Sequence, residues 1–204
     1  MKKKDLELLL QDIPPPMQPK AALEQYQTPA DIAADMLFHA AGDIQDCHVV
    51  DLGCGTGIFA VGAALLGAAR VTGVDVDAAV VAVAREQAGR YGVDIDFMVA
   101  DVAALDMQAD TVIMNPPFGA QHANRRADRL FLRKALDIAP VVISLHLSRT
   151  LAFIERLVSS LGGTVTHTRR YRFSIRPQFS FHTRRQANVD VTMVRTTGRR
   201  TQRR

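Results

Sequence analysis

The hydrophobic positions of the chain alternate between two periods, and the alternation is regular from residue 47 onward. Short apolar runs rich in Val and Ile predict buried strands, whereas apolar residues spaced three and four apart predict amphipathic helices. The predicted strands cover 47–52, 70–76, 94–100, 110–115, 140–147, 164–175 and 187–195. The predicted helices cover 58–68, 78–92, 128–138 and 149–161.

Strands that alternate with helices favour a parallel sheet whose helices cover both faces. We therefore expect an α/β fold with a mostly parallel, seven-stranded sheet. The last two strands have no helix between them, so the last one should run antiparallel at or near one edge. Pro14, Pro15 and Pro16 separate a short N-terminal helix from the body. With 204 residues, 48% of them hydrophobic, a single domain over 1–204 is expected.

Charge is distributed unevenly along the chain. Residues 166–204 contain eleven Arg and one acid, Asp190, whereas acids outnumber bases before them. A basic segment of this density favours a polyanion, because each neutralised phosphate releases counterions. The basic tail over 196–204 can also be a disordered solubilising end. Nucleic acid is the favoured partner, and the phosphate-binding candidates in the tail are Arg199, Arg200, Arg203 and Arg204.

Cysteine usage and hydropathy indicate the cellular compartment of the protein. Cys47 and Cys54 have neither metal-ligand spacing nor a disulfide framework, so no metal is expected and a reducing compartment is favoured. No run approaches the roughly 18 apolar residues of a membrane span, and the N-terminal apolar stretch is too short for a secretory signal. These features predict a soluble cytoplasmic protein without a membrane partner, or a nuclear one in a eukaryote.

The first predicted strand ends in "DLGCGTG", which contains Asp51, Gly53, Gly55 and Gly57. Ligands of open α/β sheets bind beyond the carboxyl ends of the strands. Glycines there let the backbone turn tightly and approach a ligand, and the following helix offers free amides. A nicotinamide dinucleotide is a rival ligand, but its fingerprint has Gly at the position held by Ile58.

Acidic residues follow the next two predicted strands. Asp75 stands where an acid accepts hydrogen bonds from ribose hydroxyls, although it can also cap the following helix, as expected of Asp77. Asp101 can accept a hydrogen bond from an adenine amino group while the Val102 amide donates to a ring nitrogen; an ordinary loop Asp is the alternative. Together with the glycine loop, these elements resemble the class I S-adenosylmethionine-dependent methyltransferases, which have a Rossmann-like fold.

The motif "NPPF", Asn115 to Phe118, follows the fourth predicted strand, beside the methyl donor in that fold. The amine of a base is a poor nucleophile because its lone pair is delocalised. The Asn115 side-chain oxygen and the Pro116 carbonyl can each accept an N–H and favour a pyramidal nitrogen. Phe118 offers a stacking face, and Pro116 and Pro117 hold the turn rigid. The base must be flipped or single-stranded to enter; a Pro-rich strand exit is the structural alternative.

Similar motifs serve adenine and cytosine amines and a glutamine amide of release factors, where Tyr usually replaces Phe118. Residues 20–195 resemble the methyltransferase-like protein 5 family through "LEQYQTPADIAADML", "DLGCGTGIFAVGAALLGA", "VIMNPPFG", "DRLFLRKAL", "ISLHLSRT" and "QFSFH". The resemblance implies an RNA adenine-N6 methyltransferase that uses S-adenosyl-L-methionine, yields S-adenosyl-L-homocysteine and acts on small-subunit ribosomal RNA. Members are archaeal and eukaryotic, and the eukaryotic ones work with a small zinc-binding activator subunit; an archaeal source is expected here.

The resemblance also assigns residues that the patterns alone leave without a role. Gln25, Tyr26 and Thr28 match a segment that closes over the donor, so residues 1–27 should form a helical extension and donor-closing segment. Read alone, "EQYQTP" predicts a capped helix start before Pro29. The two Phe of "QFSFH" can lie near the substrate entrance or in the core. The expected donor-binding residues are Gln25, Tyr26, Thr28, Asp51, Gly53, Gly55, Gly57, Asp75, Asp101, Val102 and Asn115.

Three arginines that follow the motif, Arg125, Arg126 and Arg129, have no counterpart in the family pattern. We expect them to contact the RNA backbone. Two other functions stay open. Glutamine-amide methylation of a translation factor is disfavoured by Phe118 and by the basic end of the chain, and a non-catalytic RNA-binding or assembly module would retain the fold without the reaction.

Overall fold

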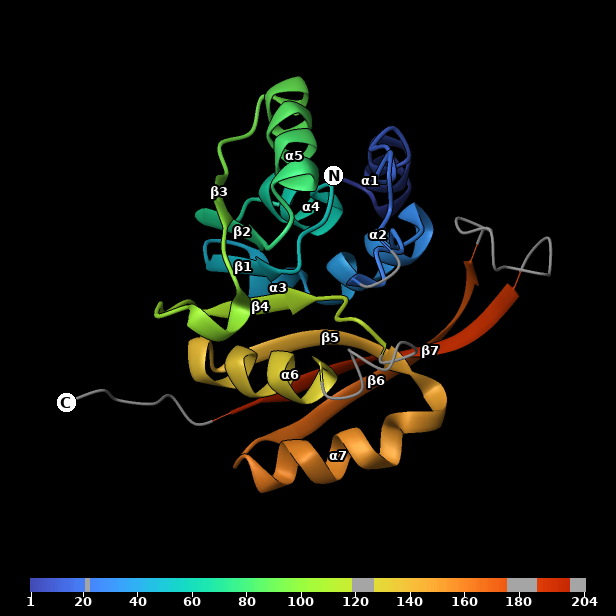
Figure 1. The fold of residues 1–204 in the computed structure, drawn as a ribbon, viewed down its shortest axis with the longest axis vertical. Helices are drawn as coiled ribbons and strands as arrows, with labels where there is room; N and C mark the ends of the chain where they lie inside the picture. The colour runs from blue at the N-terminus through green and yellow to red at the C-terminus, as the bar shows by residue number, and fades with distance from the viewer. Residues whose placement is uncertain (21–22, 119–126, 176–186, 199–204) are drawn as a thin grey trace.

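The computed structural model describes residues 1–20, 23–118, 127–175 and 187–198 (Figure 1). The strands are β1 (His48–Leu52), β2 (Arg70–Asp75), β3 (Asp96–Val99), β4 (Thr111–Met114), β5 (Val141–Leu147), β6 (Thr164–Ile175) and β7 (Ala187–Thr197). The α-helices are α1 (Lys3–Leu10), α2 (Ala30–His39), α3 (Ala41–Ile44), α4 (Ile58–Leu65), α5 (Ala78–Tyr91), α6 (Ala127–Ile138) and α7 (Leu151–Ser160). Short 3-10 turns form η2 (Val102–Ala104) and η4 (Ser148–Thr150). Among the described helices, none is long and apolar enough to cross a membrane.

The strands form one seven-stranded sheet in the order β3-β2-β1-β4-β5-β7-β6. The pairs among β1 to β5 are parallel, whereas β7 runs antiparallel to both β5 and β6. The last strand inserts between β5 and β6, so it lies one position inside the edge and β6 forms the edge. The predicted mostly parallel sheet with an antiparallel last strand is confirmed.

Helices cover both faces of the sheet, and alternate strand residues separate the two faces. Val49 and Ile113 pack in one apolar layer with α1, α2, α4 and α5, and Val50 and Val112 pack in another with α6 and α7. Figure 1 shows these two groups of helices on opposite sides of the sheet. Because a shift of one residue would exchange the two layers, burial on both faces fixes the register of the central strands.

The strand order reverses at β1, which lies between β2 and β4. In open α/β sheets a crevice forms outside the carboxyl ends of the strands at such a switch point. The glycine loop follows β1 and "NPPF" follows β4. The topology therefore brings the two strongest motifs of the sequence to one crevice.

Candidate functional site

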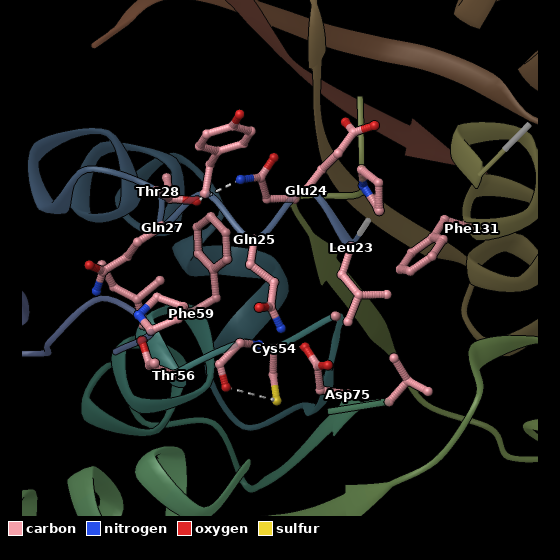
Figure 2. Close-up of a pocket in the computed structure, with 18 of the residues that line it drawn as sticks. Leu23, Glu24, Gln25, Gln27, Thr28, Cys54, Thr56, Phe59, Asp75 and Phe131 are labelled. Atoms are coloured by element: carbon pink, nitrogen blue, oxygen red, sulfur yellow. Dashed lines mark hydrogen bonds between the residues drawn. The ribbon is translucent and has the colours of Figure 1, made fainter. Parts of the chain in front are cut away.

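A cavity of about 330 Å³ occupies this crevice (Figure 2). Its volume is in the range of small-molecule sites, which is about 300–1,000 Å³. In Figure 2, Leu23, Glu24 and Gln25 of the N-terminal segment lie across from Cys54 and Asp75. Nine of the eleven residues predicted to hold the donor line it: Gln25, Tyr26, Thr28, Gly53, Gly55, Asp75, Asp101, Val102 and Asn115.

The three glycines of the loop all have the left-handed backbone that L side chains rarely adopt, with φ of 73°, 52° and 92° at Gly53, Gly55 and Gly57. A Cβ on Gly57 would lie 3.2 Å from the Cβ of Ala84, so this glycine lets α4 pack against α5. A Cβ on Gly55 would meet no described atom within 4 Å. The space beside Gly55 is therefore free for a ligand to approach the backbone.

Asp51 does not line the cavity but is buried beneath the glycine loop. It is 1% exposed, and its Oδ2 accepts a hydrogen bond of 3.0 Å from the Ala60 amide of α4. Burial is the main cause that raises the pKa of Asp51 to about 8; the hydrogen bond from the Ala60 amide opposes it, and the charge of Asp75 adds to it. Within the described ranges, Asp51 Oδ1 has no hydrogen-bond partner. A cation bound nearby would therefore favour the ionised form of the Asp51 carboxyl group.

Asp75 holds the glycine loop in place. Its two carboxylate oxygens accept hydrogen bonds of 2.9 Å each from the backbone amides of Gly55 and Asp77. Burial raises the pKa of Asp75. Asp77, not Asp75, caps α5, because its Oδ1 accepts from the Ala79 amide at 3.1 Å. The predicted cap at Asp77 is confirmed, and the capping alternative for Asp75 is wrong.

The N-terminal segment is fastened over the cavity through Asp77. Gln25 Nε2 donates to Asp77 Oδ2 at 2.9 Å, and Lys20 Nζ lies 2.9 Å from the same oxygen. Gln25 Oε1 in turn accepts from the Lys20 amide at 2.8 Å. The hydrogen bond from Gln25 holds the pKa of Asp77 below its usual value against the effect of burial, with further help from Lys20.

Thr28 and Asn115 both line the cavity and are joined by a hydrogen bond, and Figure 2 draws a dashed line from the labelled Thr28. Asn115 Nδ2 donates to Thr28 Oγ1 at 3.0 Å, and Thr28 is 3% exposed. The expectation that "EQYQTP" caps a helix is wrong: α2 begins at Ala30, its N-cap residue Pro29 makes no side-chain cap, and the Thr28 hydroxyl bonds Asn115 instead. In the described part of the chain the buried Asn115 Oδ1 has no partner. The amide is therefore oriented through its nitrogen, while its buried oxygen has no hydrogen-bond partner among the described residues.

The rest of the motif surrounds Asn115. Pro117 lines the cavity, and Pro116 is buried. The half-buried ring of Phe118 packs against Phe173 of β6, with ring centroids 6.2 Å apart and an angle of 84° between the planes. The edge strand β6 thus reaches the motif, which the sequence pattern did not indicate.

Glu24 and Phe131 are among the lining residues of the cavity that the sequence patterns did not predict. Glu24 is 8% exposed and has a left-handed φ of 48°. Burial raises the pKa of the neighbouring Tyr26, and the charge of Glu24 adds to this effect. Phe131 of α6 also lines the cavity. Glu24 belongs to "LEQYQTPADIAADML" and Phe131 to "DRLFLRKAL", but neither segment by itself distinguishes a cavity residue from its neighbours.

The remaining predicted residues divide between exposed positions and undescribed ones. Asp101 lines the cavity and caps η2, with its Oδ1 accepting from the Ala103 amide at 2.8 Å. The exposed Arg129 has its guanidinium 4.7 Å from the ring centroid of Phe153. The segment "QFSFH" and the other arginine candidates lie outside the described residues: Arg125, Arg126, Arg199, Arg200, Arg203 and Arg204.

Known proteins resemble this chain along nearly all of its length. The Danio rerio rRNA N(6)-adenosine-methyltransferase METTL5 is 34% identical over 97% of this chain and 99% of its own. Its Drosophila melanogaster counterpart is 35% identical over 96% of each chain. The crystal structure of a proposed RNA methyltransferase from Pyrococcus horikoshii is 38% identical, covers 97% of this chain and 98% of its own, and has a TM-score of 0.90.

The family of the methyltransferase small domain matches residues 27–139, which span the glycine loop, both acidic loops and "NPPF". The predicted class I methyltransferase fold is confirmed by this match and by the shared architecture. The chain therefore belongs to the methyltransferase small domain family and, by its full-length similarity, to the methyltransferase-like protein 5 family.

Proposed function

We propose that this protein transfers a methyl group from S-adenosylmethionine to the exocyclic amine of an adenine in RNA, giving N6-methyladenosine. The observation that carries the proposal is the Asn115 amide, fixed through its nitrogen by Thr28 and left with a buried oxygen acceptor at the cavity. The two relatives named rRNA N(6)-adenosine-methyltransferases support ribosomal RNA as the substrate. We extend this to small-subunit ribosomal RNA, and hence to an intracellular protein; the Pyrococcus relative agrees with an archaeal source.

The cavity fits the methyl donor. When bound, S-adenosylmethionine supplies a methyl group on a positively charged sulfonium. Asp51, whose Oδ1 has no partner in the described ranges, would offer negative charge beneath the loop to the cationic donor. The methionyl end of the donor would lie in the open space at Gly55, against Gly53 and the backbone amides of the loop. Gly57 is the N-cap residue from which α4 begins.

The nucleoside half of the donor would be held by the two acidic loops. Each Asp75 oxygen already accepts one hydrogen bond and keeps a lone pair for a ribose hydroxyl. Asp101 and Val102 would bind the adenine ring. Gln25 and Tyr26 would cover the bound donor, as the contact from Gln25 to α5 supports.

The acceptor base would be held by "NPPF". Asn115 Oδ1 and the Pro116 carbonyl would each accept one N–H of the target amine, which favours a pyramidal nitrogen with an available lone pair. Phe118, backed by Phe173, would stack on the base, and Pro117 would fix the turn. Together these groups would orient the target amine toward the methyl group of the donor. A direct displacement depends on this orientation more than on acid or base catalysis.

We propose one domain over 1–204, with 1–27 as a helical extension and donor-closing segment and 196–204 as a basic tail. The arginines of the tail and Arg125, Arg126 and Arg129 would contact phosphates of the RNA. This assignment rests on their positive charge, because Arg side chains that neutralise phosphates favour RNA binding.

A small zinc-binding activator subunit would dock on the β3 edge of the sheet. β3 is the first strand in the sheet order, and the exposed fractions of Met98, Val99 and Val76 beside it are 43%, 49% and 54%. Apolar side chains on an open strand edge favour pairing with another chain. Met98→Lys should abolish binding of such a subunit without changing donor binding; binding that survives the substitution would exclude this edge.

The reaction is tested with isotopically labelled donor, total RNA and a translation release factor as alternative acceptors. Label should appear in RNA as N6-methyladenosine. Label on a glutamine of the protein would overturn the RNA assignment, and donor binding without transfer to either acceptor would favour a non-catalytic module.

Two variants separate donor from acceptor roles. Asn115→Ala should abolish transfer, while donor binding measured by calorimetry stays within about threefold of wild type, a difference of under 1 kcal/mol. Asp75→Ala should lose both, because it removes the support of the glycine loop. Equal loss of donor binding in the two variants would show that the acceptor site is misassigned.

A further inference from the structure

The arginines of the β6–β7 pair fall on two faces with different surroundings. On the face toward α2, Arg169 Nε lies 2.7 Å from Asp35, which is 5% exposed and also accepts from the Tyr171 hydroxyl at 2.9 Å. On β7, Arg195 makes two hydrogen bonds to Asp43, of 2.8 Å and 2.7 Å. Both arginines are compensated by acids, so their charges stabilise the fold and are not available to a ligand.

Arg170 and Arg172 point to the opposite face, because side chains alternate along a strand. Arg172 has a single described acid nearby, Asp190 at 3.9 Å, and the two side chains are 75% and 72% exposed. An ion pair this exposed contributes little, about 0–1 kcal/mol. Within the described residues Arg170 forms no ion pair, and the residue opposite it on β7 is Thr192. Two guanidinium groups thus face solvent with little compensation.

A third arginine joins this face through η4. Ser148 Oγ lies 2.8 Å from Thr192 Oγ1, so η4 rests on β7 at the position opposite Arg170. The next residue, Arg149, is exposed. Farther along the same face Val194 is covered by α7. The cations therefore lie on the part of the face that α7 leaves open.

This group of cations adjoins the acceptor motif. β6 is antiparallel to β7, which is antiparallel to β5, so the carboxyl end of β6 lies at the same edge of the sheet as Asn115. Phe173 packs on Phe118 and directly follows Arg172, a step of about 3.3 Å along a strand. Because adjacent side chains alternate, Phe173 faces Phe118 while Arg172 points to the other face of the sheet, so a chain leaving the acceptor site in this direction reaches Arg172 by passing around the edge strand β6.

We propose that Arg149, Arg170 and Arg172 form a phosphate-binding strip that holds the RNA backbone next to the target nucleotide. The inference rests on the proposed function, since it takes RNA as the substrate. A polyanion matches the chemistry, because uncompensated guanidinium groups bind phosphate in a bidentate manner and gain from counterion release. Arg169 and Arg195, although in the same basic region, take no part in this binding.

The strip is tested by comparing two double variants of equal charge change in the full chain. The test variant is Arg170→Gln with Arg172→Gln. The control is Arg70→Gln with Arg90→Gln: Arg70 begins β2, which lies next to the far edge strand β3, and pairs with the exposed Asp96 at 2.7 Å, and Arg90 is in the last turn of α5. Binding of a small-subunit ribosomal RNA transcript is measured over a series of salt concentrations, together with donor binding and melting temperature.

The test variant should lower the slope of log affinity against log salt by about 1.4–1.8, and the control by much less. Arg149→Gln should lower it by about one further contact, 0.7–0.9. Donor affinity and melting temperature should not change, whereas Arg169→Gln should reduce the melting temperature. Equal slopes in the two double variants would overturn the strip while wild-type methylation of RNA still stands. Failure of the wild-type protein to methylate RNA would instead overturn the proposed function.

Discussion

Thr28→Val tests whether the Thr28 hydroxyl orients the catalytic amide. Valine has nearly the shape of threonine but offers no acceptor to Asn115 Nδ2, which donates to Thr28 Oγ1 at 3.0 Å. A buried donor left without a partner costs about 1–3 kcal/mol. The amide would recover part of this cost by rotating, and the rotation would move Asn115 Oδ1 away from the acceptor amine.

If the cost falls on the transition state, each 1.36 kcal/mol lowers the rate about tenfold, so kcat should drop by roughly 5-fold to 150-fold. Donor affinity should stay near wild type, because the bond concerns Asn115 and not the donor. Single-turnover methylation of RNA and calorimetric titration with S-adenosylmethionine measure the two quantities. Thr28→Ser keeps the hydroxyl and is the matched control.

Two results would refute this reasoning. An unchanged kcat in Thr28→Val would show that the amide does not need the hydroxyl. A large loss of donor affinity with a proportionate loss of rate would mean that Thr28 contacts the donor, as the family resemblance implies, and not the amide alone.

Three further perturbations follow from burial and backbone geometry. Because burial raises the pKa of Asp51 to about 8, the loss of donor affinity in Asp51→Asn should be greater at about pH 9 than at about pH 6, which titration at both pH values measures. Burial opposes ionisation of Asp35, but its hydrogen bonds and the charge of Arg169 lower its pKa; its stabilisation is therefore present above the unfolded pKa of about 4 and lost as pH falls through the folded value. Asp35→Asn should accordingly lower the free energy of unfolding at neutral pH by about 1–3 kcal/mol and weaken its decline in acid, which denaturant titrations check. Gly57→Ala should destabilise by at least about 1–2 kcal/mol, since φ is 92° and the new Cβ would lie 3.2 Å from Ala84; an unchanged melting temperature would contradict this.

The fold was predictable because local patterns and long-range packing agree. Val49 and Val50 belong to opposite apolar layers, and buried parallel strands of this kind read as continuous apolar runs. The cap at Asp77 was also predictable, since a cap bonds an amide two or three residues away. Such patterns predict only short-range contacts, such as helix caps, and packing that follows a regular hydrophobic period.

The role of Thr28 was not predictable, because its partner Asn115 lies 87 positions away along the chain. The difference between Arg169 and Arg170 was hidden for another reason. Adjacent arginines look alike in sequence, and the pairing of β6 with β7, including an irregularity between Val165 and His167, decides which face each one takes. Charge counts located the basic region but could not separate its structural arginines from its exposed ones.

Few residue types can replace Asp77 without loss of one of its contacts. A helix N-cap ordinarily tolerates Ser, Thr, Asn or Asp, because one side-chain oxygen is enough. Here one oxygen caps α5 and the other receives Gln25 and Lys20. Ser and Thr lack the second oxygen, and Asn would present an NH₂ group to two donors. Relatives that keep this clasp should therefore carry Asp at this position even though the helix alone would accept four residue types.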